Sequence, residues 1–140
     1  METKIKAYAF KLLSKRDYFS EEMRKALLKK GFSEDKVDKV VNYLIKEGYI
    51  NDSKLIERIK EKALEKGKSP LYLKKKLYEK GVKADVNFSF EEELKSALNL
   101  LRNKYKKEKS YPEIVKFLKY RGFSYSVIQE ACEIFLKEEE

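Results

Sequence analysis

The chain has 140 residues, 42% of them hydrophobic, and its 33 Lys and Arg against 24 Asp and Glu give a formal net charge of +9. It contains no histidine and its five glycines are isolated, which argues against metal catalysis, Ser/His or Cys/His dyads and glycine-rich phosphate loops. No apolar run approaches the roughly 18 residues of a membrane span, and the N-terminus lacks an apolar signal core. We therefore expect a cytoplasmic protein that is not an enzyme and uses no cofactor or metal.

Residues 1–50 predict three helices. Ser20, ahead of two glutamates, predicts the N-cap of the second helix, and Gly31 after Lys30 predicts its left-handed C-cap. Apolar residues at helical spacing mark the three helices in turn: Ile5, Tyr8, Ala9 and Leu12; Met23 and Leu27; and Val37, Val40, Val41, Leu44 and Ile45.

Residues 51–89 repeat the first two of these helices. Ser69 before Pro70 predicts an N-cap followed by proline at the first helical position, and Gly81 after Lys80 predicts the stop. The apolar positions are Leu55, Ile56, Ile59 and Ala63, and then Leu73 and Leu77. The stretch from Val82 to Phe90 leaves little room for a third helix, which we expect to be shortened or missing.

Residues 90–140 again predict three helices. Ser89 with Glu92, and Ser110 with Glu113, have the spacing of a capping box, and Gly122 after Arg121 is the third stop. The apolar positions are Leu94, Ala97, Leu98, Leu101 and Tyr105; Ile114 and Leu118; and Val127, Ile128, Ala131, Cys132 and Phe135. Cys132, the only cysteine, is expected in the core.

The three glycine stops align these segments with one another. Leu27, Leu77 and Leu118 each lie four residues before their glycine. The predicted fold is therefore all-α, an elongated array of three tandem three-helix repeats with bounds 1–50, 51–89 and 90–140, the second with a shortened third helix. Such units bury their apolar faces against neighbouring units.

Basic residues are concentrated toward the C-terminal half. Lys95 to Arg121 holds nine cations and two acids, between acidic stretches at Glu91–Glu93 and Glu138–Glu140. Lysine clusters bind anionic partners such as phosphates, although a solvated charged face has the same composition. The candidate partner- and DNA-binding residues are Lys29, Lys30, Lys74, Lys75, Lys76, Lys80, Lys106, Lys107, Lys119 and Arg121.

The aromatic residues mainly supply bulk to small helical cores. Tyr72, Tyr78, Tyr120 and Tyr125 are the candidates for exposed aromatic contacts. A helix-turn-helix that reads bases is disfavoured, because the helix after Gly31 begins with acids that would repel phosphate.

Two strings are distinctive. Gly48, Tyr49, Ile50, Asn51 and Asp52 form a helix stop followed by a cap for the next helix, and we interpret Gly48, Tyr49, Asn51 and Asp52 as a structural joint. The second string is Arg121-Gly122-Phe123-Ser124-Tyr125. With the Lys30-Gly31-Phe32 stop, these motifs resemble the RecX family of recombinase regulators over essentially the whole chain.

The resemblance implies a regulator that binds RecA and its nucleoprotein filament and that inhibits recombinase activity, filament assembly and ATP hydrolysis in DNA repair, recombination and the SOS response. It also implies a monomer with weaker binding to single- or double-stranded DNA. From the charge alone, a non-sequence-specific nucleic-acid-binding helical protein is an alternative, and an adaptor for another acidic protein is a third.

Overall fold

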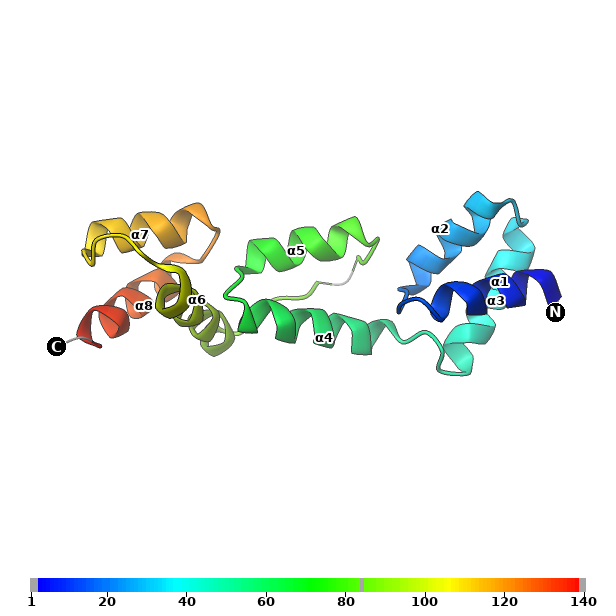
Figure 1. Ribbon diagram of the computed structural model, residues 1–140, viewed down its shortest axis with the longest axis horizontal. Coiled ribbons are helices and arrows are strands. Elements are labelled where there is room, and N and C mark those ends of the chain that lie inside the picture. The colour runs from blue at the N-terminus through cyan, green and yellow to red at the C-terminus, as the bar shows by residue number, and fades with distance from the viewer. Residues whose placement is uncertain (1–2, 84, 139–140) are drawn as a thin grey trace. The chain divides into compact units, whose positions relative to one another are not determined.

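The computed structural model describes residues 3–83 and 85–138, which form eight α-helices and no strand (Figure 1). The predicted all-α fold is confirmed. Two residues of the predicted acidic tail, Glu139 and Glu140, lie outside the described residues. The helices are α1 (Thr3–Leu13), α2 (Ser20–Lys30), α3 (Glu34–Lys46), α4 (Asp52–Glu65), α5 (Pro70–Glu79), α6 (Phe90–Lys104), α7 (Tyr111–Tyr120) and α8 (Tyr125–Lys137).

The chain divides into two compact units. Unit 1 holds the described residues through Glu57 together with Leu77–Lys83, and unit 2 holds Arg58–Lys76 and the described residues from 85 onward. Helices α4 and α5 thus contribute residues to both units. The division of the sequence into segments 1–50, 51–89 and 90–140 stays a prediction.

Unit 1 is built around the contacts of α1, α2 and α3 with one another. Its core consists of the apolar residues that recur at helical spacing, and Ile50 joins them from beyond α3. The buried members are Ile5, Ala9, Met23, Leu27, Val37, Val40, Val41, Leu44 and Ile50. Ile45 was predicted among them, but it is exposed, because it lies beside the buried face of α3 and not on it.

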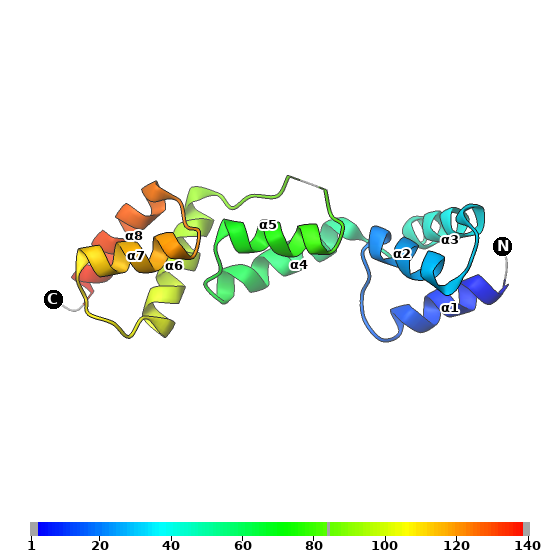
Figure 2. The ribbon, with the colours of Figure 1, turned by 90° about the horizontal axis from the view of Figure 1, so that it is seen from above.

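In unit 2, α8 packs against both α6 and α7. Within this unit the end of α4 and the start of α5 lie side by side in both views (Figures 1 and 2). The core contains Cys132, and burial raises the pKa of its thiol to about 11. The other buried core residues are Ala97, Leu98, Leu101, Tyr105, Ile114, Leu118, Phe123, Val127, Ile128, Ala131 and Phe135.

The three predicted glycine stops have one geometry. Gly31, Gly81 and Gly122 all have positive φ angles, and the residue after each glycine donates its N–H to the carbonyl of the leucine four residues before that glycine. This is the Schellman arrangement, which satisfies helix carbonyls that would otherwise lack a partner. After Gly81, no helix forms among residues 82, 83 and 85–89, in agreement with the expected loss of the third helix there.

The predicted N-caps are confirmed in two cases. Ser69 Oγ accepts the N–H of Tyr72 at 3.2 Å, just before α5 begins at Pro70. Ser89 Oγ accepts the N–H of Glu92 at 3.1 Å, and the Glu92 carboxylate accepts the N–H of Ser89 at 2.8 Å. The second pair completes the capping box at the start of α6.

Of the other two predicted caps, the one at Ser20 is misplaced, and Ser110 is the N-cap residue of α7 but forms no capping box. Ser20 is the first residue of α2, and the N-cap is Phe19, whose side chain is buried. The helix therefore starts one residue earlier than predicted, and the Asp52 carboxylate accepts hydrogen bonds from the Ser20 N–H and hydroxyl. Ser110 does precede α7, but its side chain makes no capping hydrogen bond, so it forms no capping box with Glu113.

None of the helices in the described part of the chain is long and apolar enough to cross a membrane.

Candidate binding groove on helix α7

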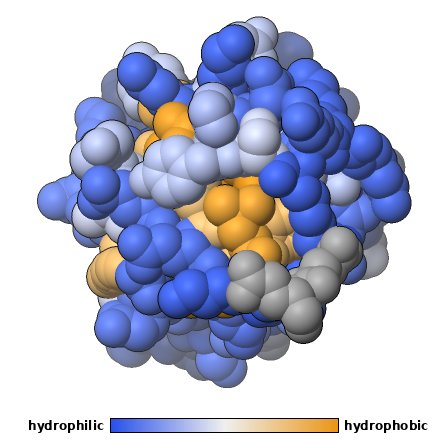
Figure 3. Space-filling view, turned by 90° about the vertical axis from the view of Figure 1, so that its left-hand side faces the viewer, coloured by the Kyte–Doolittle hydropathy of each residue, from blue (hydrophilic) through white to orange (hydrophobic). Residues whose placement is uncertain are grey.

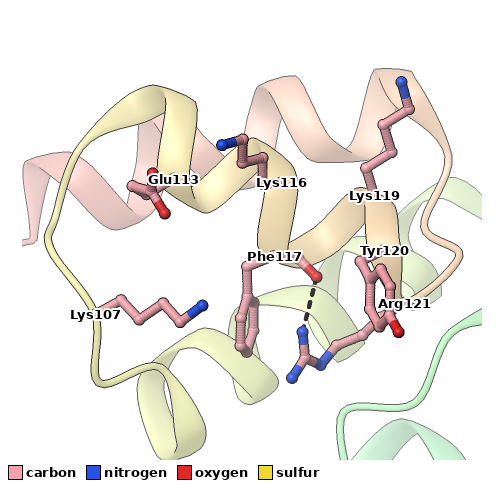
Figure 4. Close-up of a pocket in the computed structure, with 7 residues that line it drawn as sticks. All are labelled: Lys107, Glu113, Lys116, Phe117, Lys119, Tyr120 and Arg121. Carbon is pink, nitrogen blue, oxygen red and sulfur yellow. Dashed lines mark hydrogen bonds between the residues drawn. The ribbon is translucent and has the colours of Figure 1, made fainter.

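An open groove of about 760 Å³ lies in unit 2 between α7 and the segment that precedes it. Figure 4 shows Lys107 on that segment and the other lining residues on α7 or just after it. We call this surface the α7 groove. It is lined by Lys107, Glu113, Lys116, Phe117, Lys119, Tyr120 and Arg121.

The spacing of residues along α7 creates the groove. Ile114 and Leu118 are fully buried and hold the helix on the core. Residues three and four apart share a helix face, so Glu113, Phe117 and Tyr120 follow one another along the side that faces the groove. The sequence therefore separates a buried stripe from a lining stripe on the same short helix.

The segment that carries Lys107 is held in place by Tyr105. This tyrosine is buried, and its hydroxyl donates to the carbonyl of Glu108. Burial raises the pKa of Tyr105, and the carboxylates of Glu113 and Glu108 raise it further. The hydroxyl therefore stays protonated and continues to donate at neutral pH. In Figure 4 the Lys107 side chain points toward the Phe117 ring.

Arg121 is fixed against Phe117 by two contacts. Its guanidinium carbon lies 3.6 Å from the centre of the Phe117 ring, and its Nη1 donates to the Phe117 carbonyl at 3.0 Å. The ring itself makes an edge contact with Tyr105, with 5.0 Å between ring centres. A cation stacked on an aromatic face and hydrogen-bonded at the same time keeps few rotamers. The groove therefore contains a preformed arginine–aromatic pair.

The groove is strongly cationic. Its lining has four cations, Lys107, Lys116, Lys119 and Arg121, and one acid, Glu113. An anion is attracted to such a surface, the more so in a concave site. In the described part of the chain, no group of three or more acidic or cysteine side chains could hold a metal ion.

Three of the predicted binding residues, Lys107, Lys119 and Arg121, line the groove, while Lys106 is exposed beside it. Sequence reasoning missed Lys116 and did not separate Phe117 from the aromatic residues expected to fill the helical cores. The i, i+4 spacing of Phe117 and Arg121 on a short helix was the available signal for their contact.

The remaining predicted lysines lie outside the groove. On α5, Lys74 and Lys75 are exposed, and Lys76 is half-buried with its Nζ over the Tyr72 ring. In unit 1, Lys29 and Lys30 are exposed at the end of α2. Lys80, also in unit 1, forms an ion pair with Glu22 at 3.5 Å.

Three of the four candidate exposed aromatics are exposed. The exposed fractions are 82% for Tyr78, 90% for Tyr120 and 70% for Tyr125. Tyr72 is half-buried, because the Lys68 and Lys76 side chains lie over its ring. The exposure of Tyr120 matters most, since this residue lines the groove.

The predicted joint has a different geometry at each residue. Gly48 adopts a φ angle of +81° after α3, and the Tyr49 ring makes an edge contact with Phe10. Asn51 caps α4, because its Oδ1 accepts the N–H of Lys54 at 3.1 Å. Asp52 acts on another helix: its carboxylate accepts the Ser20 N–H at 2.8 Å and the Ser20 hydroxyl at 2.6 Å. Sequence reasoning did not find this last contact.

Apolar surface is scarce on the face at the left-hand side of Figure 1. Where grey atoms do not cover it, this face is mostly hydrophilic around a small apolar patch (Figure 3). Large contiguous apolar patches mark hydrophobic docking sites. This face therefore offers mainly hydrophilic side chains for recognition.

Comparison with known proteins gives the family. Residues 6–44 match the model for the first three-helix domain of RecX, the part of the chain that spans α1 to α3. A crystal structure of RecX from Lactobacillus salivarius has the same fold, with a TM-score of 0.78 and 20% identity over 94% of each chain.

Curated relatives match over most of their length. Regulatory protein RecX of Vibrio vulnificus is 29% identical over 88% of this chain and 87% of its own. Regulatory protein RecX of Legionella pneumophila strain Corby is 32% identical over 87% of this chain and 88% of its own. The resemblance found in the motifs is thereby confirmed, and the chain belongs to the RecX family of regulatory proteins.

Proposed function

We propose that this chain binds the RecA recombinase and RecA–DNA filaments and inhibits recombinase activity, filament assembly and ATP hydrolysis. Membership of the RecX family supports the choice of partner. The proposed protein acts in the cytoplasm as a monomer, through three helical segments, and catalyses no reaction itself.

The α7 groove is the structural feature that best supports this proposal. A filament of protein on DNA presents phosphates and acidic side chains, and the groove presents four cations around a fixed arginine–aromatic pair. Charge complementarity of this kind raises the rate of association and selects the orientation of the partner. Arginine and tyrosine are also the residues that most often dominate interface energies.

The direct test measures RecA on single-stranded DNA with increasing amounts of this chain. ATP hydrolysis and filament length are followed together, and both are expected to fall. If neither changes at severalfold excess over RecA, the proposal is wrong.

A charge-reversal pair locates the interaction. Lys107→Glu with Lys119→Glu places two acids in the groove and should weaken filament binding about tenfold, which corresponds to about 1.4 kcal/mol. Lys39→Glu with Lys46→Glu makes the same charge change at exposed positions of α3 and should keep binding within about twofold. Equal losses in both pairs would show that net charge alone, and not the groove, drives the association.

A non-sequence-specific nucleic-acid-binding protein is the second candidate. The exposed Lys74 and Lys75 on α5 favour it, because such lysines neutralise phosphates regardless of sequence. Competition separates the two functions. Preference for the filament over the same mass of naked DNA supports the RecA regulator, and equal affinity supports the nucleic-acid-binding protein.

A further inference from the structure

We propose that the α7 groove is a nucleotide site, in which a base stacks on the exposed aromatic and arginine groups while the lysines hold its phosphates. The proposed function places the RecA–DNA filament on the same groove, and a nucleotide is the chemical group that the groove itself recognises. The shared chemistry is a base joined to phosphate. It is available from a free nucleoside triphosphate or from a nucleotide within a single strand.

The size of the groove suits such a ligand. Its volume of about 760 Å³ falls within the roughly 300–1,000 Å³ that small-molecule sites occupy. One wall is the side of α7 and the other is the segment carrying Lys107, as Figure 4 shows. A planar ring can therefore enter from solvent without displacing a helix.

The planar groups of the groove are placed for stacking. Tyr120 is 90% exposed, so its ring can pack against a base. Arg121 lies on the Phe117 ring at 3.6 Å and the residue as a whole remains exposed to solvent, so a stacked guanidinium is already present at the edge of the groove. Aromatic and guanidinium planes are the usual surfaces on which unpaired bases stack.

The charges of the groove match the rest of a nucleotide. Lys107, Lys116 and Lys119 supply ammonium groups for phosphate oxygens. Glu113, the one acid of the lining, can accept a hydrogen bond from the amino group of a base, as carboxylates do from cytosine. Both the acid and the cations of the groove would therefore contact a bound nucleotide.

A nucleotide explains this arrangement better than an acidic peptide does. Carboxylates of a peptide would pair with the lysines but would leave the exposed Tyr120 ring without a stacking partner. An internal comparison supports this. At the equivalent positions of α2, counted from the glycine stop, Ala26, Lys29 and Lys30 replace Phe117, Tyr120 and Arg121. Helix α2 therefore keeps the charge and lacks the rings.

The test uses the full chain without RecA and a matched pair of variants. Tyr120→Ala removes the ring from a position that supports no core, and Tyr120→Phe keeps the ring. The probes are ATP, inorganic triphosphate, a fluorescent oligothymidylate of twelve nucleotides and an abasic strand of the same length. Calorimetry measures binding of the first two, and fluorescence anisotropy measures binding of the strands.

We expect Tyr120→Ala to weaken ATP or oligothymidylate binding about tenfold, Tyr120→Phe to bind within about twofold of the parent, and the probes without a base to be insensitive to both. Binding of ATP identifies a free nucleotide, and binding of the strand alone identifies single-stranded nucleic acid. The proposal is overturned if Tyr120→Ala leaves both base-bearing probes unchanged. It is equally overturned if a polyglutamate peptide binds the groove while the nucleotides do not.

The outcome is independent of the RecA assay. Nucleotide binding with no effect on RecA would remove the proposed function and keep this site. Regulation of RecA that is unchanged in Tyr120→Ala, with no nucleotide bound, would do the opposite.

Discussion

Helices α2 and α7 end in the same way and present different outer faces. In both, the residue after the glycine donates to a leucine carbonyl at 3.3 Å, from Phe32 to Leu27 and from Phe123 to Leu118. Both leucines are fully buried. The backbone geometry and the inward face of the two helices are thus the same.

At equivalent positions before the glycine, the outer faces share cations, Lys30 with Arg121 and Lys25 with Lys116, but they differ in their aromatic rings. Arg121 stacks on Phe117 at 3.6 Å, whereas Lys30 lies 5.1 Å from the ring of Tyr8, a residue of α1. Because α2 has Ala26 at the position of Phe117, its terminal cation has no ring on its own helix. The difference shows that the repeat fixes the core and the helix stop, while the solvent-facing positions determine what each copy can bind.

The largest expected effect on stability comes from replacing Gly122 with alanine, and Gly31 serves as the comparison. A methyl group on Gly122 would lie 2.8 Å from Leu71 Cβ, whereas one on Gly31 would meet nothing within 4 Å. Both residues have positive φ, so alanine costs about 1–2 kcal/mol at either site, and overpacking adds about 1–3 kcal/mol at Gly122 alone. Gly122→Ala should therefore lose about 2–5 kcal/mol of unfolding free energy and Gly31→Ala about 1–2 kcal/mol.

Urea unfolding measures both losses, and Cys132 gives a local readout. This buried thiol is the only one in the chain and lies in the core of unit 2. Its raised pKa of about 11 slows its reaction in the folded state, since the thiolate is the reactive form. Labelling should accelerate more in Gly122→Ala than in Gly31→Ala. Equal losses and equal labelling rates would contradict the steric difference between the two turns.

A second comparison concerns carboxylates that cap a distant helix. In unit 1 the Asp52 carboxylate accepts the N–H and the hydroxyl of Ser20 at the start of α2. In unit 2 the Glu93 carboxylate accepts the N–H and the hydroxyl of Ser124, each at 2.6 Å, before α8. In each unit, a carboxylate from one helix therefore caps the start of another helix. Helix α4 caps α2 in unit 1, and α6 caps α8 in unit 2.

Removal of these carboxylates should have an intermediate effect. Glu93→Ala is expected to lower the free energy of unfolding by about 2 kcal/mol and Asp52→Ala by about 1 kcal/mol, because each removes a helix cap. The cost is higher for Glu93, since its side chain is only 6% exposed and its buried methylenes are lost as well. Thermal unfolding measures the two changes. Glu91→Ala, at an exposed position in the same turn of α6, is the control and should stay within about 0.5 kcal/mol. A larger loss for Asp52→Ala would contradict the ranking.

The sequence predicts best what depends on neighbouring residues along the chain. The glycine stops, the caps at Ser69 and Ser89 and the buried stripe of Ile114 and Leu118 all follow from local spacing. Ser20 was assigned wrongly because its partner, Asp52, is 32 residues away. No local pattern indicates such a pairing.

The α7 groove was predictable in part. Lys107, Lys119 and Arg121 were found from charge, and Tyr120 was among the candidate exposed aromatics, whereas Lys116 was missed. Their assembly around Phe117 was not predictable, because it depends on a side-chain contact and on the fold of the segment before α7. The charge pattern of the sequence predicts an anionic partner. The position of the binding site depends on the tertiary packing of Phe117 and Tyr105.

The smallest expected effect concerns ion pairs between helices. In unit 2, Arg102 on α6 donates from Nη2 to the Glu138 carboxylate at 2.8 Å. In unit 1, Arg24 on α2 donates to Glu34 at 2.9 Å and also binds Asp38. The hydrogen bond from Arg102 lowers the pKa of Glu138, and the charges of Arg102 and Lys109 lower it further.

A carboxyl whose pKa is lower in the folded state stabilises the fold above its unfolded pKa and loses that contribution as the pH falls through the folded value. Both partners are partly exposed, so Arg102→Ala should cost only about 0.5 kcal/mol at neutral pH. The difference from the parent should shrink as the pH falls toward and through the lowered pKa of Glu138, and it should also shrink in 1 M salt. Urea unfolding at pH 7 and pH 3 measures it. A loss that was undiminished at pH 3 would show that Arg102 acts through packing of its aliphatic stem and not through Glu138.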